Sequence, residues 1–175
     1  EEYVIAGLTD LINAPFVYRK ATLIACVGQG GGAGSVSVGG KGGGIHIRGG
    51  ATISIVNTTI DGNDTDESDG GGIYAYEAPF EITGSSISNN SANGDGGGIA
   101  VDENSLSTII NTTITANTGS EGGGIYIRNS TVEMNLLNIN NNYASIGGGI
   151  RIRDNSTVSI DSSSINNNSA SVGSS

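Results

Sequence analysis

Arginine and tyrosine side chains recur at two fixed distances after glycine triplets in this sequence. A first column holds the fifth residue counted from the start of each triplet: His46, Tyr74, Ala100, Tyr126 and Arg151. A second column lies two residues further along: Arg48, Tyr76, Asp102, Arg128 and Arg153. Tyrosine rings and guanidinium groups suit a docking face for a glycan or for an acidic surface of another subunit. The alternative is that both residue types are simply favourable in exposed strands.

A second cluster of reactive side chains is acidic. The stretch DGNDTDESD offers Asp61, Asp64, Asp66 and Asp69, whose carboxylates are the oxygen ligands that calcium prefers. The spacing does not fit an EF-hand, because Thr65 stands where the third ligand belongs and no glycine follows it. A solvated loop is therefore the favoured interpretation. We expect no cofactor, and calcium at this loop is the one candidate metal.

Seven Asn-x-Ser/Thr sequons mark possible sites of N-glycosylation. Random placement in a chain of this composition gives roughly four. Asn63 is a poor acceptor, because it belongs to a column of asparagines that is expected to face inward. The four candidates occupy matching turns of the repeat: Asn57, Asn111, Asn129 and Asn155.

Composition excludes several classes of partner. The net charge of −10 argues against binding to nucleic acid or to anionic lipid through a basic field. No segment approaches the roughly 18 consecutive apolar residues that a membrane-spanning helix needs. The chain begins at Glu1 without a basic and apolar leader, which we interpret as a processed product or an excised piece.

The elements that must position these residues are short strands in a repeat of 25 to 28 residues. Each repeat opens with a glycine triplet at Gly42, Gly70, Gly96, Gly122 and Gly147. Apolar residues then alternate with others in triplets at 45–47, 73–75, 99–101, 125–127 and 150–152. Alternation sends the outer members of each triplet inward and the middle member outward. A second alternation follows at 53–55, 80–82, 132–134 and 158–160, and the third repeat offers Leu106 and Ile109 there.

An isoleucine followed three residues later by an asparagine closes each repeat. These asparagines are Asn63, Asn90, Asn117, Asn142 and Asn168. Stacked asparagines can hydrogen-bond to one another and to the turn backbone, so we expect a structural ladder and no catalytic role. Repeats of nearly equal length predict a coil that returns to its start, with strands paired in parallel at about 4.8 Å per coil.

The pairing of GGGI with I-x-x-N resembles the GGAI and FxxN repeats of polymorphic outer-membrane proteins and related bacterial and archaeal surface proteins. The resemblance covers Gly42 to Val172, with Ile where that family often has Phe. It implies an all-β, right-handed parallel β-helix of about five complete coils. It also implies an extracellular or cell-surface location and a role in adhesion or surface architecture.

Polysaccharide lyases and hydrolases of the pectate-lyase-like and polygalacturonase-like kinds share this architecture. They need clustered carboxylates in a cleft walled by long loops. Here Asp102 and Glu103 are adjacent, which on a strand points them to opposite faces, and the turns are short. We therefore expect no enzyme and no catalytic residues.

The two ends of the chain suggest how copies associate. Residues 1–41 precede the repeats of 42–175 and form either an N-terminal cap or a subunit-joining segment with a glycine-rich linker. After Asn168 the sequence SASVGSS stands where a sixth triplet is due, so either the sequence is cut short here or another molecule supplies the next coil at the open parallel edge. The favoured function is a filament subunit that polymerises head to tail through residues 1–27. An adhesin stalk that binds a glycan or a host surface is the alternative.

Overall fold

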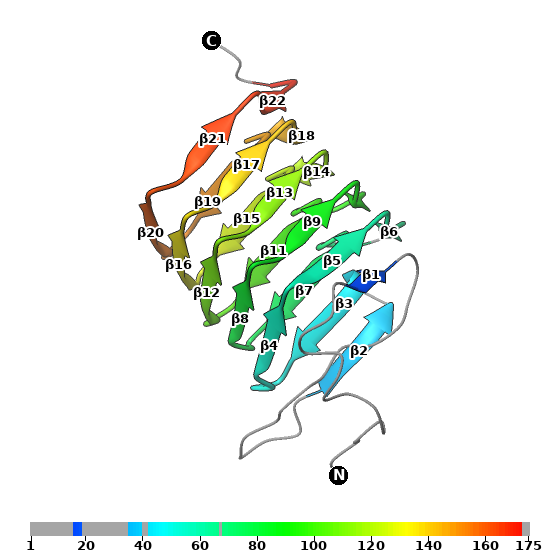
Figure 1. Ribbon diagram of the computed structural model, residues 1–175, viewed down its shortest axis with the longest axis vertical. Coiled ribbons are helices and arrows are strands. Elements are labelled where there is room, and N and C mark those ends of the chain that lie inside the picture. Colours follow the sequence, from blue (N-terminus) through cyan, green and yellow to red (C-terminus); the bar gives the residue numbers. More distant parts are fainter. Residues whose placement is uncertain (1–15, 19–34, 40–41, 67, 173–175) are drawn as a thin grey trace.

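The protein is a stack of short strands wound into a parallel β-solenoid (Figure 1). The computed structural model describes residues 16–18, 35–39, 42–66 and 68–172. Five complete coils follow one another along the rod, and each contains four strands: β3–β6, β7–β10, β11–β14, β15–β18 and β19–β22. The sequence indicated only two or three strands per repeat. The fourth was missed because its strands are only two to four residues long and directly follow the asparagines.

Strands of successive coils form four sheets, numbered here by their order within a coil. The first sheet contains β2 (Ser35–Gly39), β3 (Gly42–Arg48), β7 (Ile73–Tyr76), β11 (Ile99–Asp102), β15 (Ile125–Arg128) and β19 (Ile150–Arg153). The second contains β4 (Ile53–Val56), β8 (Phe80–Thr83), β12 (Leu106–Ile110), β16 (Thr131–Asn135) and β20 (Thr157–Asp161). The third contains β1 (Phe16–Tyr18), β5 (Thr58–Asp61), β9 (Ser86–Ser88), β13 (Thr113–Thr115), β17 (Asn138–Asn140) and β21 (Ser164–Asn166). The fourth contains β6 (Asp64–Thr65), β10 (Ser91–Ala92), β14 (Thr118–Glu121), β18 (Tyr143–Ile146) and β22 (Ser169–Ala170).

All pairs between neighbouring coils are parallel and in register, which confirms the predicted fold class. In the first sheet Ile45 pairs with Ile73, which pairs in turn with Ile99. Ile125 and Ile150 continue the same row. Equal register places like residues above one another, so every inward position becomes a column along the rod.

The core consists of these inward columns, and most of its side chains are isoleucine. Each isoleucine packs on the equivalent residue of the next coil, because no single coil could bury its own apolar face. In the third coil the register places Ser107, not Leu106, at the inward position opposite Val132. Ser107 is fully buried and its Oγ has no hydrogen-bond partner, whereas Leu106 is 64% exposed. The apolar Leu106 is thus outside the core, which sequence alternation alone could not decide.

Each glycine of a triplet meets a different steric demand, and the second coil shows all three. Gly70 has a φ of +67°, a left-handed conformation that side chains disfavour. A Cβ on Gly71 would overlap the carbonyl groups of Gly97 and Ser91. A Cβ on Gly72 would lie 3.1 Å from Nδ2 of Asn90 and 2.6 Å from the carbonyl oxygen of Gly98. The triplet therefore lets the backbone pass close to the fourth sheet and to the asparagines.

The described strands of the N-terminal segment lie at the first coil, at the end of the rod opposite β22 (Figure 1). β1 pairs in parallel with β5, and β2 pairs antiparallel with β3. β2 thus extends the first sheet, but with the opposite strand direction. The apolar runs at 3–8 and 21–27 lie outside the described residues.

Alanine at Gly97 tests the close approach of the coils. Its Cβ would overlap the backbone of Thr118, so we expect a loss of more than about 3 kcal/mol in the free energy of unfolding. Gly62→Ala is the control, because Gly62 has a φ of +66° and no atom near its Cβ position. It should cost about 1–2 kcal/mol from backbone strain alone. Urea denaturation measures both, and equal losses would contradict the steric explanation.

Candidate functional site

The first column stacks as predicted but is not a surface. Strand register aligns His46 with Tyr74, Tyr74 with Ala100 and Ala100 with Tyr126. Tyr74 and Tyr126 are only 4% and 3% exposed, and together with the buried Ala100 they form a small cluster of their own. This part of the expected docking face is therefore wrong: Tyr74 and Tyr126 are packing residues.

Carboxylates lie near both buried tyrosines and affect their protonation. Burial, together with the carboxylates of Asp102 and Asp69, raises the pKa of Tyr74. Burial and then Asp95 raise the pKa of Tyr126 to about 12. Both hydroxyls thus remain protonated at neutral pH beside carboxylates that can accept their hydrogen bonds.

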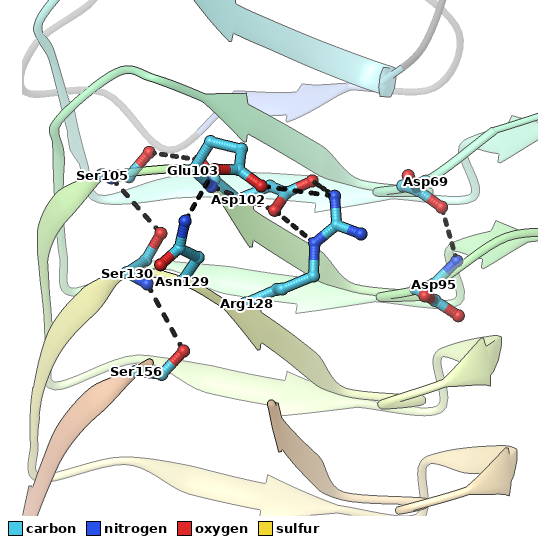
Figure 2. A network of polar contacts seen from close by, with 9 residues as sticks. All are labelled: Asp69, Asp95, Asp102, Glu103, Ser105, Arg128, Asn129, Ser130 and Ser156. Atoms are coloured by element: carbon cyan, nitrogen blue, oxygen red, sulfur yellow. Dashed lines mark hydrogen bonds and ion pairs between the residues drawn. The ribbon is translucent and has the colours of Figure 1, made fainter. Parts of the chain in front are cut away.

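Arg128 holds the strongest charged contact of the second column (Figure 2). Its Nε donates to Oδ1 of Asp102 at 2.8 Å and its Nη2 donates to Oδ2 at 2.6 Å. Asp102 is buried and its hydrogen bond to Arg128 raises the pKa of the guanidinium. This bidentate pair joins β11 to β15 and neutralises a carboxylate that water cannot reach.

Glu103 also approaches Arg128, contrary to the expectation that Asp102 and Glu103 point to opposite faces. Glu103 lies beyond the end of β11 with a φ of +47°, so strand alternation no longer applies to it. Its Oε1 is 3.8 Å from Nη2 of Arg128, and its Oε2 accepts a hydrogen bond from Nδ2 of Asn129 at 2.7 Å. The two carboxylates converge on one guanidinium.

The acids before the triplets form a ladder of their own. Oδ1 of Asp69 accepts from the backbone N–H of Asp95 at 2.8 Å (Figure 2). Oδ1 of Asp95 accepts from the N–H of Glu121 at 3.1 Å. Glu121 then contacts Arg151 at 3.0 Å and Arg153 at 3.5 Å. Burial, Asp69 and Glu121 raise the pKa of Asp95, because like charges stack along the rod.

The side chains left at the surface belong to the second column. Tyr76 is exposed, and its ring lies 6.3 Å from that of Tyr74. Arg48 and Arg153 are exposed as well, and Arg128 keeps part of its side chain in water. The structure thus brings together Arg128, Arg151 and Arg153 with carboxylates of this chain, which leaves a face of nearly balanced charge.

The five asparagines lie in one continuous amide ladder between the third and fourth sheets. In each step the backbone N–H and the Nδ2 of one asparagine donate to Oδ1 of the next. Asn90, for example, donates both bonds to Oδ1 of Asn117 at 3.0 Å each. Nδ2 of Asn117 also donates to the carbonyl oxygen of Ile87 at 3.0 Å, and later members repeat this bond. The amides thereby satisfy backbone carbonyls at a buried corner where the strands break.

The amide ladder has one open end inside the protein. Asn63 is 1% exposed, and its Oδ1 has no hydrogen-bond partner among the residues that the structure describes. Its Nδ2 and N–H donate to Asn90 as in the rest of the ladder. An unsatisfied buried acceptor costs about 1–3 kcal/mol. Asn63 is therefore a position where a further donor would stabilise the protein.

Hydroxyl ladders at two other turns were missed by the sequence analysis. The backbone N–H of Ser105 donates to Oγ of Ser130 at 3.3 Å, and that of Ser130 donates to Oγ of Ser156 at 3.4 Å (Figure 2). At the next turn Thr58 bonds to Ser85 and Ser85 to Thr112 in the same way. The signal was a Ser or Thr just before the second and third strands of the repeat, which resembles ordinary turn chemistry.

The acidic loop does not assemble a metal site in the described part of the chain. Oδ1 of Asp61 accepts from Oγ of Ser88 at 2.8 Å and from Nδ2 of Asn89 at 2.7 Å. Asp69 belongs to the acid ladder, whereas Asp64 and Asp66 are exposed. No three His, Cys, Asp or Glu side chains of the described residues form a group that could hold a metal ion.

The candidate glycosylation sites differ in accessibility. Asn57 and Asn111 occupy the same exposed turn, two coils apart, with φ values of +47° each. Asn155 is exposed, whereas Asn129 is half-buried and its amide nitrogen donates to Glu103. Of the four candidates, Asn57, Asn111 and Asn155 are thus the exposed ones.

Comparison with known proteins agrees with this architecture. The family model of the right-handed beta helix region matches residues 23–175. No curated protein and no solved structure matches the chain. Within the described residues there is no helix long and apolar enough to cross a membrane.

Removal of the Arg128 charge should destabilise the protein. Arg128→Met leaves the Asp102 carboxylate buried and unpaired, and we expect a loss of about 2 kcal/mol in the free energy of unfolding. This is less than a fully buried pair would lose, because the Arg128 side chain is 39% exposed. Adding Asp102→Asn should recover part of the loss in urea denaturation. A double variant as unstable as the sum of the single variants would show that the pair is not coupled.

The acid ladder should make stability depend on pH through Asp95. Because its pKa is raised in the folded protein, ionised Asp95 opposes folding near neutral pH, and this penalty disappears as the pH falls below the raised pKa. Asp95→Asn keeps an acceptor for the Glu121 N–H and should raise the melting temperature at pH 7. The gain should shrink towards acidic pH. Thermal melts from pH 3 to 8 measure it, and the same gain from exposed Asp64→Asn would contradict the assignment to Asp95.

Proposed function

We propose that this chain, which belongs to the right-handed β-helix family, is a non-catalytic structural subunit that assembles end to end outside the cell or on its surface. The observation that carries the proposal is the exposed apolar side chains of the last described coil. Ile152, Ile160 and Ile165 of the last coil are 43%, 42% and 45% exposed. Their partners one coil earlier, Ile127, Met134 and Ile139, are buried.

A further coil of the same shape would bury these three isoleucines. Strands β19 to β22 carry the same register as every earlier coil, so their outer edges present backbone groups in the spacing that another coil pairs with. The proposed occupant is a coil from a second copy of this chain. If the rotation between copies does not close a ring, repetition of the contact produces a filament.

A structural role is also supported by the state of the carboxylates. Asp102 and Glu103 both face Arg128, and Asp69 and Asp95 accept backbone hydrogen bonds. An acid–base pair for glycoside cleavage needs carboxyl groups free to exchange protons with a substrate. The extracellular location draws on the repeats' resemblance to surface proteins and on the exposed sequons.

A glycan-binding adhesin stalk is the second candidate, and the exposed ring of Tyr76 favours it. Tyr76 lies beside Arg48 and Asp102 in the second column, where a sugar could stack on the ring. The buried Tyr74 and Tyr126 reduce the area of this face. An adhesin would remain a monomer and bind glycans through Tyr76, so the state of assembly separates the two candidates.

Lysine at Ile160 tests end-to-end assembly. We expect the parent chain to form fibres in negative-stain electron microscopy and fast-sedimenting species in ultracentrifugation. Ile160→Lys should abolish both, because it places a charge in the contact that buries Ile160. Ser159→Lys is the matched control: Ser159 is the neighbouring residue of the same strand, outside the core column, and should leave fibres intact. Monomers from the parent chain, or fibres from Ile160→Lys, would overturn the proposal.

A further inference from the structure

We propose that β1 and β2 are a placeholder at the first coil, which the last coil of a second copy displaces. In the resulting joint, Asn168 of one copy donates hydrogen bonds to Oδ1 of Asn63 in the next. This inference rests on the proposed end-to-end assembly. It specifies the register and the polarity of the joint, and it identifies β1 and β2 as the segment that must leave before the joint forms.

The placeholder continues only two of the four sheets. β1 covers three residues of β5, from Thr58 to Ile60. β2 covers the edge of β3. The edges of β4 and β6 have no strand partner among the described residues, since they end the second and fourth sheets. A complete coil would pair with all four edges.

β2 also continues the first sheet in a way that no later coil does. It runs antiparallel to β3, and its register shifts between Ser37 and Gly39. Every pair from β3 to β19 in that sheet is parallel and without such a shift. Replacement of β2 by a parallel strand such as β19 would extend the regular parallel ladder. The exchange would therefore replace an irregular strand pair by a regular one.

The amide ladder supplies the second, independent observation. Oδ1 of Asn63 is buried without a partner in the described part of the chain, even though β1 and β2 are present at that end. At the other end, Asn168 accepts from Asn142 at 2.9 and 3.0 Å, as an ordinary member of the ladder does. No following asparagine exists in the described residues to accept from the N–H and Nδ2 of Asn168. In the ladder of the described residues, Asn63 thus lacks a donor and Asn168 lacks an acceptor. One further step of the amide ladder, formed between two copies, would supply both.

The ladder fixes the direction of the joint. Each asparagine donates to the one after it, so one end of the rod offers an acceptor and the other end offers donors. Two copies that met through their first coils would oppose two acceptors, and two last coils would oppose two sets of donors. Only head-to-tail contact pairs donor with acceptor, which gives an open, polar assembly.

Register then predicts which surface residues meet across the joint. In the second sheet, outward positions form one column: Ser54, Glu81, Thr108, Glu133 and Ser159. Continuation of the column places Ser159 of one copy next to Ser54 of another, with Cα atoms about 4.8 Å apart. That separation permits a disulfide. Within one chain the two positions are four coils apart, roughly 19 Å, so they cannot bridge.

Oxidative cross-linking of the full chain tests the joint. Ser54→Cys and Ser159→Cys are introduced together, with Cys26→Ser to remove the native thiol. We expect a ladder of disulfide-linked multimers on non-reducing gels, and none from either single cysteine. Dimers from a single-cysteine chain would show symmetric contact and overturn the head-to-tail joint. Fibres in the microscope without cross-links from the double variant would overturn this joint while leaving end-to-end assembly in place, whereas absence of fibres would overturn both.

Two further variants in the double-cysteine chain test the amide bond and the placeholder. Asn168→Asp replaces the donating amide by an acceptor and should abolish the multimer ladder, whereas Asn167→Asp at the exposed neighbour should leave it intact. A multimer ladder from Asn168→Asp equal to that of Asn167→Asp would overturn the amide bond. Val17→Pro disrupts β1 and should bring multimers at lower protein concentration. An unchanged or higher threshold would overturn the placeholder. Circular dichroism melts verify that each variant is folded.

Discussion

The architecture depends on the close stacking of one coil's backbone on the next at the corner where the glycine triplet passes the asparagine. The third glycine of a triplet leaves no room for a Cβ, since that atom would press on the side-chain amide of the asparagine in the same coil. The asparagine in turn bonds to its neighbour and to a backbone carbonyl of the preceding coil. Glycine provides the space and asparagine provides the polar partner, and neither would hold the corner alone.

Stacking in equal register has a cost for charged residues, because like positions lie about 4.8 Å apart along the whole rod. The chain reduces this cost in two ways. Asp102 is placed between neighbours in the second column so that Arg128 can neutralise it. The acids before the triplets accept backbone N–H groups of the next coil. In the first column, the small Ala100 lies between the uncharged Tyr74 and Tyr126, and the three residues form one buried cluster. Most of the predicted docking face is therefore used internally.

A solenoid also concentrates its unsatisfied groups at its two ends, since each coil contacts only its neighbours. The amide ladder makes those ends chemically different, with Asn63 as acceptor and Asn168 as donor. Burial of the exposed isoleucines of the last coil is a non-directional interaction, so it does not favour one orientation of the partner over another. Hydrogen-bond polarity supplies the direction that burial lacks. The end of such a rod is thus a specific surface even though it repeats the interior.

The sequence by itself determined the period, the inward isoleucines and the asparagine column. Alternation within a strand sets which residues face inward, and equal register repeats that choice in every coil. The parallel pairing and the number of coils followed from the same pattern. Only the tertiary structure decided which outward residues stay outward: Tyr74 and Tyr126 are buried, and carboxylates of neighbouring coils lie near them. It also decided that Glu103 joins Asp102, because a left-handed residue ends the alternation. Such contacts depend on turns and neighbouring coils, which a strand pattern does not encode.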